Sequence, residues 1–146
     1  MARLRILPFF AVSALALPAA ACDSTAESSP RWVEPERYSF TLLSEGGERG
    51  GIGKYRITVA HGKVVEAVGL DASARRTVAG EPHNVPTLGG LLAELRQARA
   101  DNADVAQALF GSDGHPTEIH LDWETNAVDD EADYLITEYH VLRATS

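Results

Sequence analysis

Apolar and polar side chains alternate along three stretches in the first half of the chain, at residues 37–43, 54–60 and 63–70. A period of two predicts half-buried β-strands, because successive side chains of a strand point to opposite faces of a sheet. A glycine-rich stretch separates the first two strands. His61 and Gly62 separate the second from the third, a length that suits a two-residue hairpin turn.

One helix is predicted, and it begins after Pro86. Thr87 is a suitable N-cap, because its hydroxyl can accept a hydrogen bond from a backbone N–H of the first turn. Gly89 and Gly90 weaken that turn by about 1 kcal/mol each relative to alanine. Residues 71–84, before the helix, are predicted to form a loop. The apolar stripe that must pack on a sheet consists of Leu88, Leu91, Leu92, Leu95 and Ala98.

Three further strands are predicted after the helix, at residues 104–110, 117–123 and 134–142, although the first of them would also suit a helix. Residues 124–133 are expected to be an acidic connector between the last two. The order βββ-α-βββ with short links favours an antiparallel sheet of about six strands. We therefore predict an α+β fold in which one amphipathic helix packs on one face of the sheet.

The first residues have the features of an export signal. Arg3 and Arg5 precede an uncharged apolar run that suits the central region of a signal peptide. Three alanines at 19–21 come directly before Cys22, and this arrangement resembles the lipobox of bacterial lipoproteins, in which the cysteine is lipidated and becomes the new N-terminus. An ordinary signal that leaves Cys22 as a free thiol is the alternative. We predict a lipoprotein-type signal peptide at 1–21 and lipidation of Cys22.

The mature chain is predicted to be a tethered domain. Residues 22–34 hold the lipidated cysteine and a flexible tether, because the small polar residues at 23–31 cannot bury apolar surface. Residues 35–146 have the size of one domain. Trp32 is expected to anchor the tether to this domain. The lipid on Cys22 would hold the exported protein on the outer face of the bacterial cytoplasmic membrane.

Composition and charge restrict the classes of partner and of site that this chain can have. The 146 residues carry 13 Lys+Arg against 21 Asp+Glu, a formal net charge of -8. This balance disfavours nucleic acid and the surface of an anionic membrane as partners, since both attract cations. A single cysteine excludes an intramolecular disulfide and the usual zinc cages built from several cysteines. The chain has no G-x-S-x-G elbow and no phosphate-binding loop, so we predict neither an enzyme nor a bound cofactor.

Acidic residues are most frequent at residues 113–138, which hold nine Asp and Glu and no Lys or Arg. Some of their oxygens follow a spacing that superficially resembles a calcium-binding EF-hand loop. Ala127 stands where that loop needs glycine, and strands rather than helices are expected on both sides. The alternative is a solvated hairpin whose charges keep a sheet edge from pairing with other chains. The candidate ligands of a weakly bound divalent metal are Asp122, Glu124, Asn126, Asp130 and Asp133.

A second candidate metal set contains His120, Asp122 and His140. The first two share one face of a predicted strand, and the third would lie near them if the last two strands pair in a suitable register. Imidazole and carboxylate together suit zinc or copper. Ordinary surface or half-buried histidines are the alternative.

Several short motifs, taken in order, resemble the DUF6174 family of small bacterial exported proteins and lipoproteins of unknown function. The resemblance covers about residues 37–140, implies a location in the cell envelope and supplies no catalytic residue. Relatives often carry a cysteine near the first hairpin and another before the last Tyr, where this chain has residues 44–53 and Asp133 instead. The motifs are Tyr38-Ser39-Phe40, residues 55–67, 85–92 and 113–119, Asp122 and residues 129–134.

Two functions remain open. The first is a non-enzymatic module, held to the membrane by lipid at Cys22, that presents a sheet face or an acidic edge to an envelope protein. The alternative is an extracytoplasmic protein that binds a metal ion or a small ligand. A concave pocket with convergent polar groups would favour the ligand binder, and an exposed apolar patch of a few hundred Å² would favour the module.

Overall fold

The computed structural model describes residues 32–46, 51–80, 84–127 and 130–143. The predicted signal peptide, Cys22 and the tether up to residue 31 lie outside these ranges. Within them, no helix is both long enough and apolar enough to cross a membrane.

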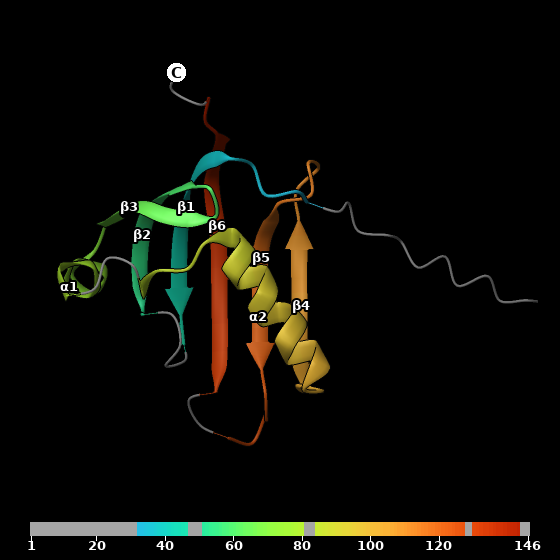
Figure 1. Ribbon diagram of the computed structural model, residues 1–146. Helices are drawn as coiled ribbons and strands as arrows, with labels where there is room; N and C mark the ends of the chain where they lie inside the picture. Colours follow the sequence, from blue (N-terminus) through green and yellow to red (C-terminus); the bar gives the residue numbers. More distant parts are fainter. Residues whose placement is uncertain (1–31, 47–50, 81–83, 128–129, 144–146) are drawn as a thin grey trace, which may run out of the picture.

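One antiparallel sheet organises the fold, and its six strands follow the order β3-β2-β1-β6-β5-β4 (Figure 1). Three consecutive strands from each half of the chain lie side by side, and the two halves meet where β1 pairs with β6. The α+β class with an antiparallel sheet of six strands is thus confirmed. The described elements are β1 (Arg37–Glu45), β2 (Gly53–Ala60), β3 (Lys63–Gly69), α1 (Ala72–Gly80), α2 (Leu88–Ala100), β4 (Val105–Phe110), β5 (Pro116–Asp122) and β6 (Glu131–Val141).

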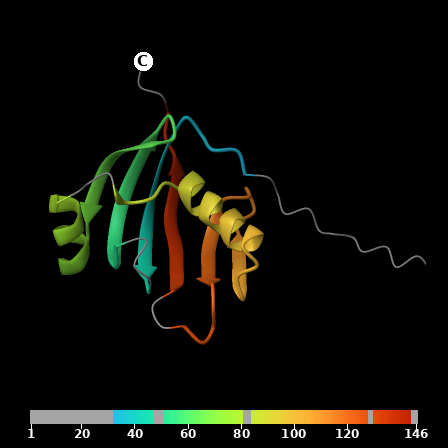
Figure 2. The same ribbon diagram turned by 60° about the horizontal axis from the view of Figure 1, so that its bottom comes forward.

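Helix α2 crosses one face of the sheet, on the side of β4 and β5, and α1 lies beside β3 (Figure 2). Burial of apolar surface under α2 supplies the core, because the alternating strands and the predicted leucine stripe bring their apolar sides together. Leu92 is only partly buried, whereas the other four members of the stripe are fully buried. The buried core is formed mainly by Tyr38, Phe40, Leu42, Tyr55, Ile57, Val59, Leu88, Leu91, Leu95, Ile119, Leu121, Tyr134 and Ile136.

Helix α1 replaces part of the predicted loop at 71–84, so the prediction of a single helix is wrong. Asp71 begins the helix, because its Oδ1 accepts a hydrogen bond of 2.8 Å from the backbone N–H of Ala74. The helix packs closely on the end of β3, where a Cβ on Gly69 would lie 2.3 Å from the backbone nitrogen of Arg75. The element order is therefore βββ-αα-βββ.

Strand β6 begins at Glu131, three residues before the predicted start, which shortens the predicted acidic connector. The side chains of Ala132, Tyr134 and Ile136 are buried, while Asp133 and Leu135 between them are exposed. The alternation of a half-buried strand therefore extends through acidic residues that had suggested a loop.

Tyr38 joins the start of the described chain to the start of α2. Its hydroxyl donates to Glu34 Oε1 at 2.7 Å and accepts from the backbone N–H of Leu88 at 3.2 Å. Burial, and then the hydrogen bond to the Glu34 carboxylate, raise the pKa of Tyr38. Trp32 packs edge-on against Tyr38, and its Nε1 donates to the hydroxyl of Tyr139 at 3.2 Å. Trp32 is thus anchored on the domain, as predicted.

The two glycines of the first turn of α2 have different surroundings. A Cβ on Gly89 would lie 2.6 Å from Glu34 Oε2, whereas a Cβ on Gly90 would make only an ordinary contact of 3.5 Å with Thr87 Oγ1. Gly89 therefore lets the Glu34 carboxylate approach the N-terminus of α2, where the helix dipole favours a negative charge.

We predict opposite consequences for alanine at these two positions. Gly90→Ala should raise the free energy of unfolding by about 0.5–1 kcal/mol, because alanine fits and restricts the unfolded chain. Gly89→Ala should lose this gain, because its methyl group displaces Glu34 from Tyr38 and costs about 1 kcal/mol of hydrogen bonding. Urea unfolding of both variants checks the prediction. A Gly89→Ala variant as stable as Gly90→Ala would contradict it.

Candidate functional site

The face of the sheet opposite α2 carries no described helix (Figures 1 and 2). Side chains from β1, β6 and β5 meet there in rows, because residues opposite one another on antiparallel neighbours lie side by side. One row contains Glu45, Asp133 and His120. The next row contains Leu43, Leu135 and Glu118. We call this surface the open face.

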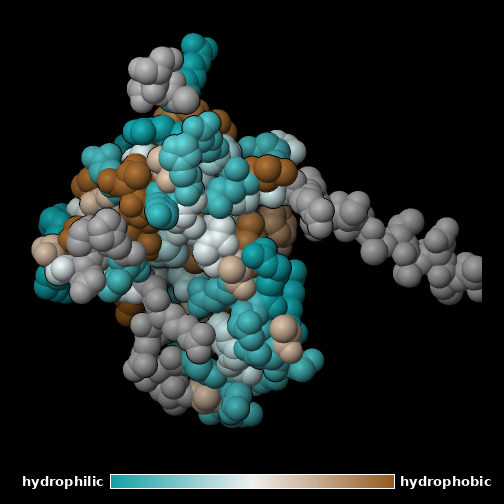
Figure 3. Space-filling model, in the orientation of Figure 1, coloured by the Kyte–Doolittle hydropathy of each residue, from teal (hydrophilic) through white to brown (hydrophobic). Residues whose placement is uncertain are grey.

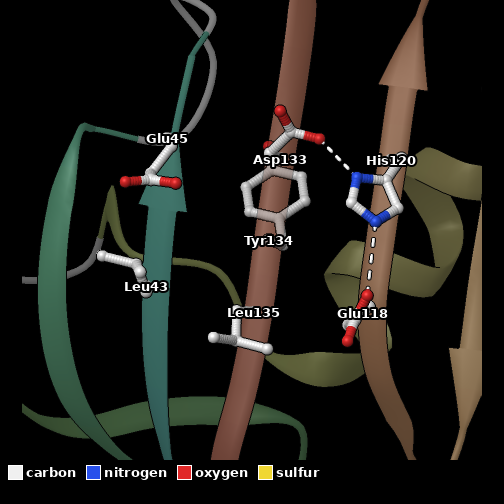
Figure 4. A pocket seen from close by; sticks show the side chains of 7 residues that line it. All are labelled: Leu43, Glu45, Glu118, His120, Asp133, Tyr134 and Leu135. Carbon is white, nitrogen blue, oxygen red and sulfur yellow. Dashed lines mark hydrogen bonds and ion pairs between the residues drawn. The ribbon is translucent and has the colours of Figure 1, made fainter.

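These two rows form a shallow hollow of about 300 Å³ in the open face (Figure 4). Leu43 and Leu135 provide its apolar part, and the polar groups lie around them. The hollow thus combines aliphatic surface with three carboxylates and one imidazole. Its lining residues are Leu43, Glu45, Glu118, His120, Asp133, Tyr134 and Leu135.

His120 lies between two of these carboxylates. Its Nδ1 is 2.5 Å from Asp133 Oδ1, and its Nε2 is 3.4 Å from Glu118 Oε2 (Figure 4). The hydrogen bond with Asp133, supported by the one with Glu118, raises the pKa of His120 even though partial burial opposes this. The protonated, positively charged imidazole is therefore favoured in the folded protein.

Two pairs of like charges face each other across neighbouring strands. Glu45 lies directly opposite Asp133, and Asp122 lies directly opposite Glu131. Loss of hydration, followed by the nearby charges of Asp130, Asp104 and Glu131, raises the pKa of Asp122. Like charges at directly opposed positions destabilise a sheet. We call these four residues the acid rows.

The structure distributes the five predicted calcium ligands over different surroundings. Asp122 ends β5, and Glu124 and Asn126 lie in the following turn. Asp130 Oδ2 accepts a hydrogen bond of 2.9 Å from the backbone N–H of Glu124, whereas Asp133 faces His120 on β6. In the described part of the chain, no group of three or more His, Cys, Asp or Glu side chains is placed to hold a metal ion.

The second predicted metal set is not brought together either. On β6, the residue opposite His120 is Asp133, and His140 lies seven positions further along, opposite Ser39 of β1. Seven strand residues span about 20 Å, so His140 and His120 do not share a site.

Sequence reasoning missed a charged cluster at the centre of the open face. Glu138 has a φ of 50° and interrupts the pairing of β6 with β1 as a β-bulge. Its Oε2 accepts hydrogen bonds from Thr41 Oγ1 at 2.6 Å and from Arg56 Nη2 at 2.5 Å. The Thr41 hydrogen bond, and then the Arg56 charge, lower the pKa of Glu138. The sequence signal for this bulge was that two polar residues, Thr137 and Glu138, follow each other where the alternation of a strand allows one.

The exposed large apolar residues of the described chain come from several elements. Figure 3 shows separate brown areas on the side of the molecule that carries α2, interrupted by hydrophilic side chains. A hollow with converging polar groups is the feature that was expected of a ligand binder. The large apolar residues that are most exposed are Val33, Ile52, Val65, Val68, Leu70, Leu109, Leu135 and Val141.

Comparison with known proteins gives one match. Residues 30–141 match a family described as a family of unknown function (DUF6174). The chain belongs to the DUF6174 family. No curated protein and no solved structure matches it. The open face of this DUF6174 domain therefore has to be interpreted from its own chemistry.

We predict that Asp133 controls the protonation of His120. Because the folded-state pKa of His120 is raised, this interaction contributes stability that is present below about pH 6.5 and is lost as pH rises through the folded pKa. Asp133→Asn should lower the pKa of His120, and Glu118→Gln should lower it less. Proton NMR titration of the imidazole signals measures both shifts.

Glu124→Gln is the matched control for this titration, because it removes one negative charge from the same acidic segment without touching His120. Its His120 pKa should equal that of the unaltered protein. An Asp133→Asn variant whose His120 titrates at the same pH or higher would show that the contact does not hold the proton.

Proposed function

We propose that this DUF6174 protein is a lipid-anchored module of the bacterial cell envelope that binds a partner protein through the open face of its sheet. The observation that carries the proposal is the pairing of Glu45 with Asp133 at the hollow. Like charges at directly opposed positions do not by themselves stabilise a sheet, and both side chains are exposed where a partner can reach them. No described helix covers this face, so a partner can approach the strands β1, β6 and β5.

The anchor supports a function close to the membrane. Cys22 follows a run of residues typical of a lipoprotein signal, and Trp32 is fixed to the domain through Tyr38 and Tyr139. The ten residue-to-residue steps from Cys22 to Trp32 span at most about 35 Å when fully extended. A lipid on Cys22 would therefore keep the domain within one domain diameter of the outer surface of the cytoplasmic membrane, where other envelope proteins are its neighbours.

The chemistry of the hollow suits recognition. Both ring nitrogens of His120 face carboxylates, so the imidazole is held in place by Asp133 and Glu118. A partner meets a fixed pattern of charges rather than a free base. Fixed charges across an interface give specificity and steer association.

A second candidate function is the binding of a small cationic ligand, and the convergence of polar groups on the hollow favours it. His120, Asp133 and Glu118 are the residues that such a ligand would meet. A saturable response to Ca²⁺ or spermidine in the titration described below would favour this second function.

We predict that Cys22→Ala releases the protein from the membrane fraction. Without the thiol there is no site for acylation, and each buried CH₂ of an acyl chain contributes about 0.8 kcal/mol to membrane binding. Fractionation of cells that express either form, followed by intact-mass analysis, measures the change. Membrane retention of the variant would contradict lipid anchoring.

We predict that partner contacts occur at the open face and not at α1. A photoreactive amino acid at Thr137, exposed on β6, should give a discrete crosslinked product in intact cells. The same amino acid at Ala79, exposed on α1, should not. Equal crosslinking at both positions, or crosslinking only at Ala79, would refute the open face as the binding surface.

A further inference from the structure

We infer that the segment docked on the open face is a basic, extended stretch of an envelope protein, with Lys or Arg at alternate positions that meet the acid rows. This inference names the chemistry of the partner and rests on the proposed function.

Charge is the first argument. Five carboxylates stand together on neighbouring strands of the open face. Among the described residues of β5 and β6 there are two basic groups: His120 lies among these carboxylates, and His140 lies at the far end of β6. Of the nearby cations on β2, Arg56 is already bound to Glu138, and Lys54 lies beside Leu43. The face is therefore complementary to positive charge. The five are Glu45, Glu118, Asp122, Glu131 and Asp133, of which Glu118 and Asp133 also contact His120.

Spacing is the second argument. Three rows of side chains cross β6, at Glu131, Asp133 and Leu135, and neighbouring rows are two residues apart along the strand. Two residues of a strand span about 6.7 Å, which is also the distance between side chains on one face of an extended peptide. A peptide that follows β6 can therefore place one basic side chain over each acid row and an apolar side chain over Leu135.

Shape is the third argument. The hollow is open along the strands, and its aliphatic part, Leu43 and Leu135, lies next to the carboxylates of Glu45 and Glu118. A Lys or Arg side chain suits this arrangement, because its methylene stem can cover apolar surface while its charged head reaches an acid. A single metal ion does not, because no suitable group of ligands exists in the described chain.

The test is a titration of the detergent-solubilised full chain with the labelled peptide acetyl-Val-Thr-Lys-Thr-Lys-Thr-Val-amide. Its pattern is the same in both directions, so it fits the acid rows whichever way it runs. Fluorescence anisotropy at low ionic strength should show saturable binding that weakens as salt is added. The peptide with Glu in place of Lys should not bind.

Two double variants each remove two negative charges, one of them from the acid rows and the other from exposed positions elsewhere. Glu45→Gln/Asp133→Asn should weaken peptide binding about tenfold or more, because it removes the carboxylates opposite the basic side chains. Glu36→Gln/Glu66→Gln, at exposed positions outside the acid rows, should leave the affinity unchanged. The first variant relieves the opposition of Glu45 and Asp133 but also weakens the hydrogen bond between Asp133 and His120, so urea unfolding verifies that it remains folded.

Three results would overturn the inference: no saturable binding of the Lys peptide, equal weakening by both double variants, or binding of spermidine or Ca²⁺ as tight as that of the peptide. The failure of the proposed function is distinguishable. Crosslinking at Thr137 that persists when the Lys peptide does not bind would leave the open face as the binding surface and reject only a basic segment as its occupant.

Discussion

The pairing of β1 with β6 is the contact on which the rest of the structure depends. It joins the first three strands to the last three, and no other strand pairing connects the two halves in the described chain. Its inner side places Tyr38, Phe40 and Leu42 against the core under α2, and its outer side places Glu45 against Asp133. One register therefore determines both the core and the candidate site, since a slip of one residue would exchange the two faces.

The strands could be predicted from sequence because burial on one face imposes a period of two, and five of the six strand predictions lie within two residues of the observed bounds at both ends. Helix α1 could not be predicted from sequence, because a short segment with a single fully buried residue, Ala74, has little amphipathic pattern. The beginning of β6 was missed for a different reason. Its exposed positions at 131 and 133 are acidic, and Leu135 is exposed as well, so the alternation was hidden.

The candidate site could be predicted only in part. The acidic stretch was visible, and it contains Asp122, Asp133 and Glu118, but their neighbours depend on contacts between distant segments. Nothing near Glu45 in the sequence indicates that it lies opposite Asp133. The bulge at Glu138 adds a further difficulty, because it shifts the alternation so that Tyr139 turns inward, where it meets Tyr38 and Trp32. Local periodicity carries no information about such a register change.

The position of the acids within the sheet decides between two explanations for them. Charges that prevent a sheet from pairing with other chains belong on edge strands. The edges here are β3 and β4, whereas Asp122, Glu131 and Asp133 lie on interior strands. Edge β4 is protected differently, because the Arg99 side chain of α2 donates to the backbone oxygen of Ala106 at 3.2 Å. Edge protection therefore does not account for the acid rows. We propose recognition of a positively charged partner instead, since the acid rows lie together at one end of an accessible face.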